Sequence, residues 1–180
     1  RKSIVVIGGG SGSSAALRGL KKYDVDLTVI VTMFDSGGSS GQLRDQLGVL
    51  PPGDILKCVL ALAQNEDEAR RILLSRLPGL EDGRLSGHTS GNLLLSMMAQ
   101  YGGDFLAAVD SLRALLDCHG RVWPVSIEHA SVCAEYADGS TASGEVAVDQ
   151  GQSEGRQIKR IWLEPDVGIH PSVADAIRGF

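Results

Sequence analysis

Hydrophobic residues in the first part of the chain form two short unbroken runs, each followed by a glycine-rich loop. Residues 3–7 (Ser-Ile-Val-Val-Ile) and 27–32 (Leu-Thr-Val-Ile-Val-Thr) are the two runs. Such runs are typical of parallel strands that are buried on both faces. Between them, Ala16, Leu17 and Leu20 recur with helical spacing, which predicts a helix with one apolar face. The pattern therefore predicts a right-handed βαβ unit.

Helical periodicity continues as far as residue 120. We expect a helix capped by Asp54 that reaches Ala63, and a second helix opened by a capping box at residues 65–68. A third helix is expected from Leu93. A fourth, strongly amphipathic helix is predicted from Asp104, ending at Gly120 in the left-handed conformation.

From residue 121 the apolar residues recur with a period of two, which predicts strands. We expect strands at 121–125, 131–136, 140–148 and 157–163, with a loop at 150–156 and a short helix from Pro171. The predicted fold class is α/β, a Rossmann-like doubly wound and mostly parallel sheet with an antiparallel β-hairpin insertion after about residue 120.

This pattern also predicts how the domain is organised. Residues 1–180 are expected to be the N-terminal part of a single nucleotide-binding domain. Its Rossmann-like core would span 1–120, a β-rich segment 121–165, and the start of a further αβ unit 171–180. Because a doubly wound sheet would continue with another strand there, we expect a C-terminal half that this sequence lacks.

Composition narrows the classes of partner. The net charge is −5 and no basic run exceeds Lys21-Lys22, so nucleic acid is not an expected partner. No apolar run is long enough to span a membrane, so a membrane partner is not expected either. The three cysteines are odd in number and far apart, which indicates a reducing cytoplasm rather than a disulfide framework. Cys58 lies in an apolar run and is expected to be buried and inert.

The first loop is a candidate diphosphate site. It comprises Gly8, Gly9, Gly10, Ser11 and Gly12, and Gly10-x-Gly12-x-x-Ala15 matches the dinucleotide fingerprint between a predicted strand and a predicted helix. In that motif the glycines permit a tight turn and let the pyrophosphate approach the backbone. The missing lysine excludes a Walker A loop.

The second loop follows the second strand and is also rich in glycine and serine. Its candidate ligand-binding residues are Asp35, Ser36, Gly37, Gly38, Ser39, Ser40 and Arg44. Free amides in such a loop can form an anion-binding nest, and a helix that begins there would point its positive end at the same place. Asp35 occupies the position that binds a ribose hydroxyl in a dinucleotide fold. The alternative is a Gly/Ser loop with Asp35 as its cap.

The third loop, residues 87–92, contains His88 and Asn92 between glycines. Near a helix N-terminus His88 would be neutral, and so able to act as a base or a hydrogen-bond partner. The alternative is that His88 and Asn92 only cap the helix. His88 and Asp35 are the candidate catalytic residues, and Asp54 is a further candidate ligand-binding residue. We predict no metal site from the sequence, because Cys118 and His119 have no second ligand pair at zinc-site spacing.

Taken in order, these three loops resemble the CofD/YvcK family, together with Leu50-Pro51-Pro52-Gly53-Asp54 and the segment 120–125. One branch of that family comprises 2-phospho-L-lactate transferases of coenzyme F420 biosynthesis. The other comprises gluconeogenesis factors, which are cytoplasmic and bind nucleotide sugars such as UDP-N-acetylglucosamine, and the resemblance is closer to this branch. Several residues depart from the family pattern, among them Thr89-Ser90, which replaces a common Ser-Leu. Ser36 stands where a second acidic residue is common, and Leu56 and Lys57 stand in place of Arg and Asn.

The resemblance implies a regulatory protein that binds a nucleotide sugar of the UDP-sugar class and acts in carbon metabolism and cell-wall morphogenesis. The alternative is a Mg²⁺-dependent transferase similar to the 2-phospho-L-lactate transferases, with His88 or Asp35 as base. A third option is an NAD-binding oxidoreductase, which the glycine fingerprint alone would permit. The expected partner is a small nucleotide ligand, and Mg²⁺ is expected only for the transferase. The sequence leaves open whether the protein forms a homodimer.

Overall fold

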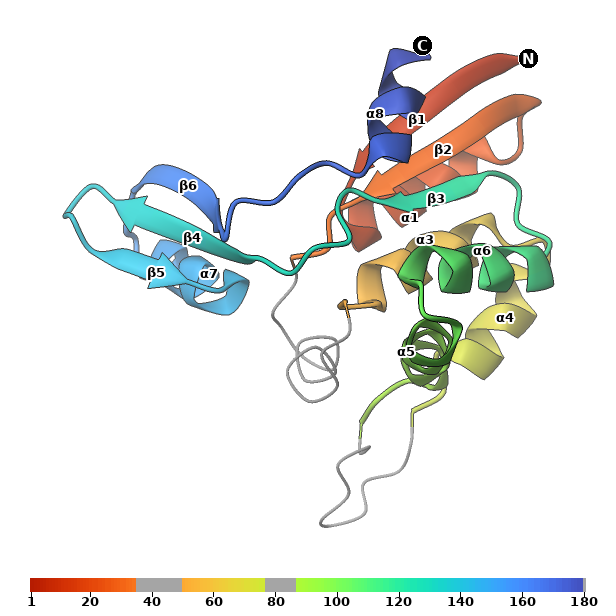
Figure 1. The fold of residues 1–180 in the computed structure, drawn as a ribbon, viewed down its shortest axis with the longest axis horizontal. Coiled ribbons are helices and arrows are strands. Elements are labelled where there is room, and N and C mark those ends of the chain that lie inside the picture. Colours follow the sequence, from red (N-terminus) through yellow and green to blue (C-terminus); the bar gives the residue numbers. More distant parts are fainter. Residues whose placement is uncertain (35–49, 77–86, 180) are drawn as a thin grey trace.

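Strands β1 (Lys2–Gly8), β2 (Val25–Val31) and β3 (Arg121–Pro124) form a parallel sheet in the order β1-β2-β3. The computed structural model describes residues 1–34, 50–76 and 87–179 (Figure 1). β2 is the central strand, and its Val29, Ile30 and Val31 are buried. The register aligns Gly8 with Val31 and Val31 with Pro124, so the carboxyl ends of all three strands meet at one edge. The predicted parallel sheet and βαβ unit are confirmed.

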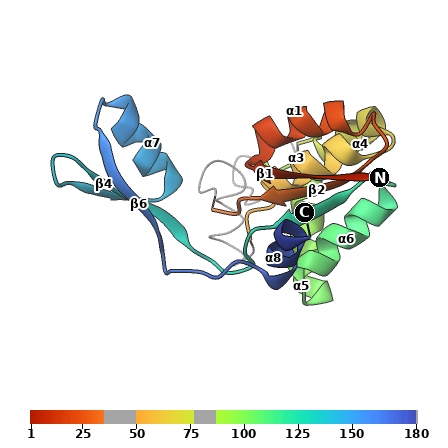
Figure 2. The ribbon, with the colours of Figure 1, turned by 90° about the horizontal axis from the view of Figure 1, so that it is seen from above.

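Helices cover both faces of this sheet, as a doubly wound fold requires. The elements that follow β1 and β2 are α1 (Gly10–Leu20), α3 (Gly53–Leu62), α4 (Glu66–Leu73), α5 (Ser90–Gly102) and α6 (Phe105–Leu115). Leu17 of α1 and Val59 of α3 share one buried core with Leu27, Val29 and Val122 of the sheet. The last helix, α8 (Pro171–Arg178), lies on the opposite side of the sheet from α1 (Figure 2).

α3 is the most deeply buried of the described helices. Ile55, Leu56 and all residues from Cys58 to Leu62 are buried. The helix is therefore enclosed, with α1, α4, α5 and α6 packed around it. Burial raises the pKa of the Cys58 thiol to about 12, in agreement with the prediction of a buried, inert cysteine.

Residues between β3 and α8 form a small arm that projects from the core (Figure 1). It contains an antiparallel sheet of β5 (Thr141–Ser143), β4 (Ser131–Tyr136) and β6 (Ile158–Glu164), in that order, with α7 (Glu145–Ser153) on one face. The chain enters and leaves the arm at one point, because the His170 amide donates to the Val125 carbonyl at 2.9 Å. Near that point the Trp123 and His170 rings stack, with their centroids 6.4 Å apart.

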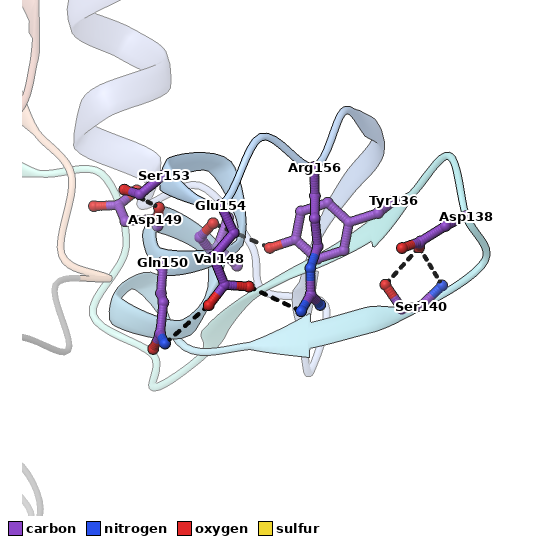
Figure 3. A network of polar contacts seen from close by, with 9 residues as sticks. All are labelled: Tyr136, Asp138, Ser140, Val148, Asp149, Gln150, Ser153, Glu154 and Arg156. Atoms are coloured by element: carbon purple, nitrogen blue, oxygen red, sulfur yellow. Dashed lines mark hydrogen bonds and ion pairs between the residues drawn. The ribbon is translucent and has the colours of Figure 1, made fainter.

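Tyr136 holds α7 against the sheet of the arm. Its hydroxyl donates to the Val148 carbonyl at 3.0 Å, and the Arg156 guanidinium lies over its ring, 5.7 Å from the centroid (Figure 3). Arg156 also pairs with Glu154 at 2.9 Å. Tyr136, Ala134 and Val148 form a second small core, separate from that of the parallel sheet.

The structure corrects several local predictions. The strand expected at 140–148 ends at Ser143, and α7 replaces its second half and most of the loop expected at 150–156. The reason is Gly144, whose φ of +89° is a left-handed angle that ends the strand and begins the helix. The helix expected to reach Gly120 ends at Leu115, and the left-handed turn there is made by Asp117.

Two expected helix caps are also absent. Asp54 lies inside the first turn of α3, and Pro52 takes the cap position. The Asn65 side chain makes no cap hydrogen bond to α4. The adjacent Glu66 pairs with Arg18 and Lys21 of α1, so α4 is held to α1 by charge.

Candidate nucleotide site at the carboxyl ends of the sheet

The first glycine loop lies where the fold class places ligands. Gly8 ends β1, Gly9 caps α1 in extended conformation, and Gly10 opens the helix. The amino end of α1 therefore lies at the carboxyl edge of the sheet, with no acidic residue in its own first turn. The helix dipole and the unsatisfied amides of this turn favour an anion at this position.

Asp54 and Lys57 of α3 are packed against this loop. A Cβ atom on Gly10 would lie 2.7 Å from Asp54 Cγ and 2.7 Å from Lys57 Cδ. A Cβ on Gly9 would lie 3.3 Å from Asp54 Oδ2 and 3.8 Å from Thr32 Oγ1. The absence of a side chain at Gly10 is thus what lets the Asp54–Lys57 pair reach the amino end of α1.

Gly12 has a different environment. A Cβ there would meet no described atom within 4 Å, and the residue is exposed. The packing of the described residues therefore does not require glycine at this position. Exposed backbone beside a helix N-terminus is what the close approach of a phosphate needs.

The second loop begins at the same edge but lies outside the described residues. The Thr32 amide donates to the Gly8 carbonyl at 3.2 Å, so the chain leaves β2 beside the first loop. Asp35, Ser36, Gly37, Gly38, Ser39, Ser40 and Arg44 all fall within residues 35–49 and remain predictions.

The third loop packs on other helices. His88 is fully buried and Asn92 is 5 % exposed, so neither lies on an open surface. The cap of α5 is Thr89, whose Oγ1 accepts from the Asn92 amide at 3.3 Å. Gly91 lies against α3 and α4, since a Cβ there would be 2.7 Å from Leu56 Cδ2 and 2.8 Å from the Leu73 carbonyl oxygen.

The side chain of Asn92 has one unusual feature. Its Oδ1 is buried and has no hydrogen-bond partner among the described residues. A buried acceptor in this state is uncommon in native proteins. The contacts of Gly91 are with α3 and α4, and those of Gly10 are with Asp54 and Lys57 of α3, so α3 packs against both the first and the third loop.

Sequence reasoning named Lys57 only as a departure from the family pattern and not as a binding residue, and it missed Thr32. Lys57 lies three positions after Asp54 on a helix, a spacing that places both on one face. That spacing was the available signal. Thr32 closes the second predicted strand and carried no distinguishing pattern.

Two other observations bear on what this part of the chain can bind. Among residues 1–34, 50–76 and 87–179, no group of three or more His, Cys, Asp or Glu is placed to hold a metal ion. A cavity of about 730 Å³ lies at the opposite edge of the sheet, where it is lined by Ser3, Asp26, Arg121 and residues of α8. Ligands of open α/β sheets bind at the carboxyl ends of the strands, so the candidate nucleotide site is at the glycine edge.

The comparison with known proteins agrees with this fold and these loops. Residues 4–179 match the family model described as 2-phospho-L-lactate transferase CofD. The chain therefore belongs to the CofD family. None of the described helices is both long enough and apolar enough to cross a lipid bilayer.

Particular relatives define its place in that family more closely. The chain is 39 % identical over 176 residues to the gluconeogenesis factor of Listeria monocytogenes, covering 97 % of this chain and 53 % of that protein. It is likewise 39 % identical to the gluconeogenesis factor of Bacillus subtilis, covering 99 % and 55 %. The crystal structure of a Bacillus halodurans protein superposes with a TM-score of 0.90 at 38 % identity, covering 99 % of this chain and 56 % of that one. The chain thus spans about half the length of these relatives.

Proposed function

We propose that this chain is a cytoplasmic, gluconeogenesis-factor-like protein that binds a nucleotide sugar of the UDP-sugar class. Its role would be regulatory, in carbon metabolism and cell-wall morphogenesis. The observation that carries the proposal is the exposed Gly12 backbone at the amino end of α1, at the edge of the sheet where nucleotides bind. The likeness to gluconeogenesis factors supports it.

In this proposal the first turn of α1 holds the diphosphate through its backbone amides, and Asp35 accepts a hydrogen bond from a ribose hydroxyl. None of these roles requires a nucleophile. Hydrogen bonds from amides and the dipole of α1 contribute affinity for the diphosphate without any turnover.

The test is a calorimetric titration of the purified chain with UDP-N-acetylglucosamine, NAD and GDP, each with and without Mg²⁺. We expect saturable binding of the UDP-sugar and no product. Binding of NAD alone would favour an oxidoreductase instead, and no binding of any of the three nucleotides would overturn the proposal.

A matched pair of glycine variants locates the site. Gly12→Ala adds a methyl group that meets no atom of the described residues within 4 Å, so stability should be unchanged or slightly improved. UDP-sugar affinity should fall about tenfold or more, because the methyl group takes the space of the phosphate. Gly19→Ala, on the same helix and equally unhindered, should leave affinity unchanged. Equal affinities for the two variants would show that the first loop is not part of the binding site.

Two further variants test the predicted roles outside this loop. Asp35→Ala should weaken nucleotide binding, and a change smaller than twofold would contradict the ribose assignment. His88→Ala should alter binding or turnover if His88 belongs to the site. If it lowers only thermal stability, His88 is a structural residue.

The match to the CofD model favours one alternative, a Mg²⁺-dependent transferase that moves a phosphate-linked group from a nucleotide donor to an alcohol. In this case a base such as His88 or Asp35 would take the proton of the acceptor hydroxyl. Consumption of a guanine nucleotide in the presence of Mg²⁺ and an alcohol acceptor would establish this activity.

A further inference from the structure

The ion pair between Asp54 and Lys57 lies inside the candidate nucleotide site. Lys57 Nζ is 2.8 Å from Asp54 Oδ1, and the two side chains are 47 % and 18 % exposed, Lys57 being the more open. Both pack on Gly10, the first residue of α1. The pair therefore stands at the amino end of the helix, where the diphosphate would bind.

This arrangement raises an electrostatic difficulty. The Asp54 carboxylate carries a negative charge next to the position proposed for two further negative charges. Like charges at contact distance disfavour binding unless a positive charge offsets them, and proteins that bind diphosphates commonly use a divalent cation for this. The dipole of α1 contributes only about half a unit of positive charge.

Among the described residues, Lys57 is the cation positioned to offset the carboxylate. Two cationic side chains at the other end of α1, Arg18 and Lys21, are bound to Glu66 of α4 instead. The Lys57 amino group, by contrast, is bonded to the carboxylate that contacts Gly10, and about half of its side chain is open to solvent.

We infer that Lys57 supplies the positive charge that lets this site take a nucleotide diphosphate without a divalent cation. Lys57 is then a positioning residue, because it acts on the ligand indirectly by offsetting the charge of Asp54. Nucleotide binding to the wild-type site does not require Mg²⁺. The inference rests on the proposed function, since it concerns the same site.

The experiment measures the dissociation constant of UDP by calorimetry, with millimolar Mg²⁺ and with a chelator. The chains compared are wild type, Lys57→Met, Asp54→Asn and the double variant. We expect the wild-type constant to change less than twofold with Mg²⁺. Lys57→Met in chelator should bind about tenfold more weakly, and Mg²⁺ should restore most of that loss.

The double variant separates this role from direct contact between Lys57 and the ligand. Once Asp54→Asn removes the negative charge, replacing Lys57 should cost little affinity. Lys22→Met, an exposed lysine at the other end of α1, is the control for net charge and should leave the constant unchanged. Circular dichroism and the thermal midpoint show that each variant is folded.

Each result bears on the inference. A wild-type chain that binds UDP only with Mg²⁺ overturns it, and so does an equal loss from Lys57→Met with and without Asp54→Asn. A wild-type chain that binds neither UDP nor UDP-N-acetylglucosamine under either condition overturns the proposed function as well. Binding that is lost in Gly12→Ala but unaffected in Lys57→Met leaves the proposed function standing and overturns this inference alone.

Discussion

The Arg18 guanidinium of α1 donates to the Glu66 carboxylate of α4 at 2.5 Å, across a sequence separation of 48 residues. Lys21 adds a second contact to the same carboxylate at 3.3 Å. Glu66 is the least exposed of the three side chains, at 16 %. These two contacts with Glu66 join the first βαβ unit to the helices that follow it.

Removing the charge of Glu66 should destabilise the fold. Glu66→Gln leaves two cations without a carboxylate, and we expect the free energy of unfolding to fall by about 1–2 kcal/mol in urea titrations. Glu68→Gln is the matched control, because its pair with Arg71 is well exposed and should be worth less than about 0.5 kcal/mol. Equal effects would show that the α1–α4 pair contributes no more than a surface contact.

The same carboxylate predicts how stability depends on pH. Burial acts to raise the pKa of Glu66, but hydrogen bonds and charge attraction from Arg18 and Lys21 outweigh it and lower the pKa below its usual 4.5. A lowered pKa in the folded state adds stability above pH 4.5, which is lost as the pH falls through the folded pKa. The stability difference between wild type and Glu66→Gln should therefore be full at pH 7 and shrink in acid. A difference that stays constant with pH would contradict this assignment.

Gly151 in α7 should resist a substitution that normally favours helices. A Cβ there would lie 2.5 Å from Tyr136 Cζ, so Gly151→Ala should cost about 1–3 kcal/mol of stability in the arm. Gly19→Ala in α1, which meets no atom within 4 Å, should instead gain up to about 1 kcal/mol. Hydrogen exchange of the arm and of the core measures the two effects separately.

Tyr136→Phe provides the internal check on this clash. It removes the hydroxyl oxygen, which is the atom nearest to where a methyl group on Gly151 would lie, together with its bond to Val148. Gly151→Ala should therefore cost less in the Tyr136→Phe background than in wild type. An unchanged cost would mean that the Tyr136 hydroxyl is not the source of the clash.

The thiol of Cys58 should be unreactive in the folded protein. Its pKa of about 12, against an ordinary 9.0, leaves about a thousandth of the thiolate that an unfolded chain has at neutral pH. Alkylation by iodoacetamide, followed residue by residue by mass spectrometry, should be at least about a hundredfold slower at Cys58 than in urea. Because the folded pKa is raised, this group stabilises the fold fully below pH 9 and progressively less as the pH rises toward 12.

Strong local periodicity is what made much of the fold predictable. The apolar runs that became β1 and β2 and the amphipathic stripe of α6 were found within a few residues of their observed ends. α7 was missed because Val146 and Val148 alternate with small residues as in a strand. What decides its conformation is the left-handed Gly144 and the packing of Val148 on Tyr136, a contact between residues twelve apart.

The candidate site, like the fold, could be predicted only in part from the sequence. The position of the first loop followed from the order strand, glycines, helix. The proximity of Asp54 and Lys57 to Gly10 did not, because it depends on how α3 packs against α1 across more than forty residues. Long-range packing of this kind leaves no trace in local spacing.

The hydrogen bond from the His170 amide to the Val125 carbonyl holds the two ends of the arm together beside the main sheet. Residues 126–169 could be replaced by a short turn without moving β3 or α8, since the two ends of the segment already meet. The arm also has its own small core around Tyr136. The arm can therefore change in length and surface without displacing the edge of the sheet that carries the glycine loop.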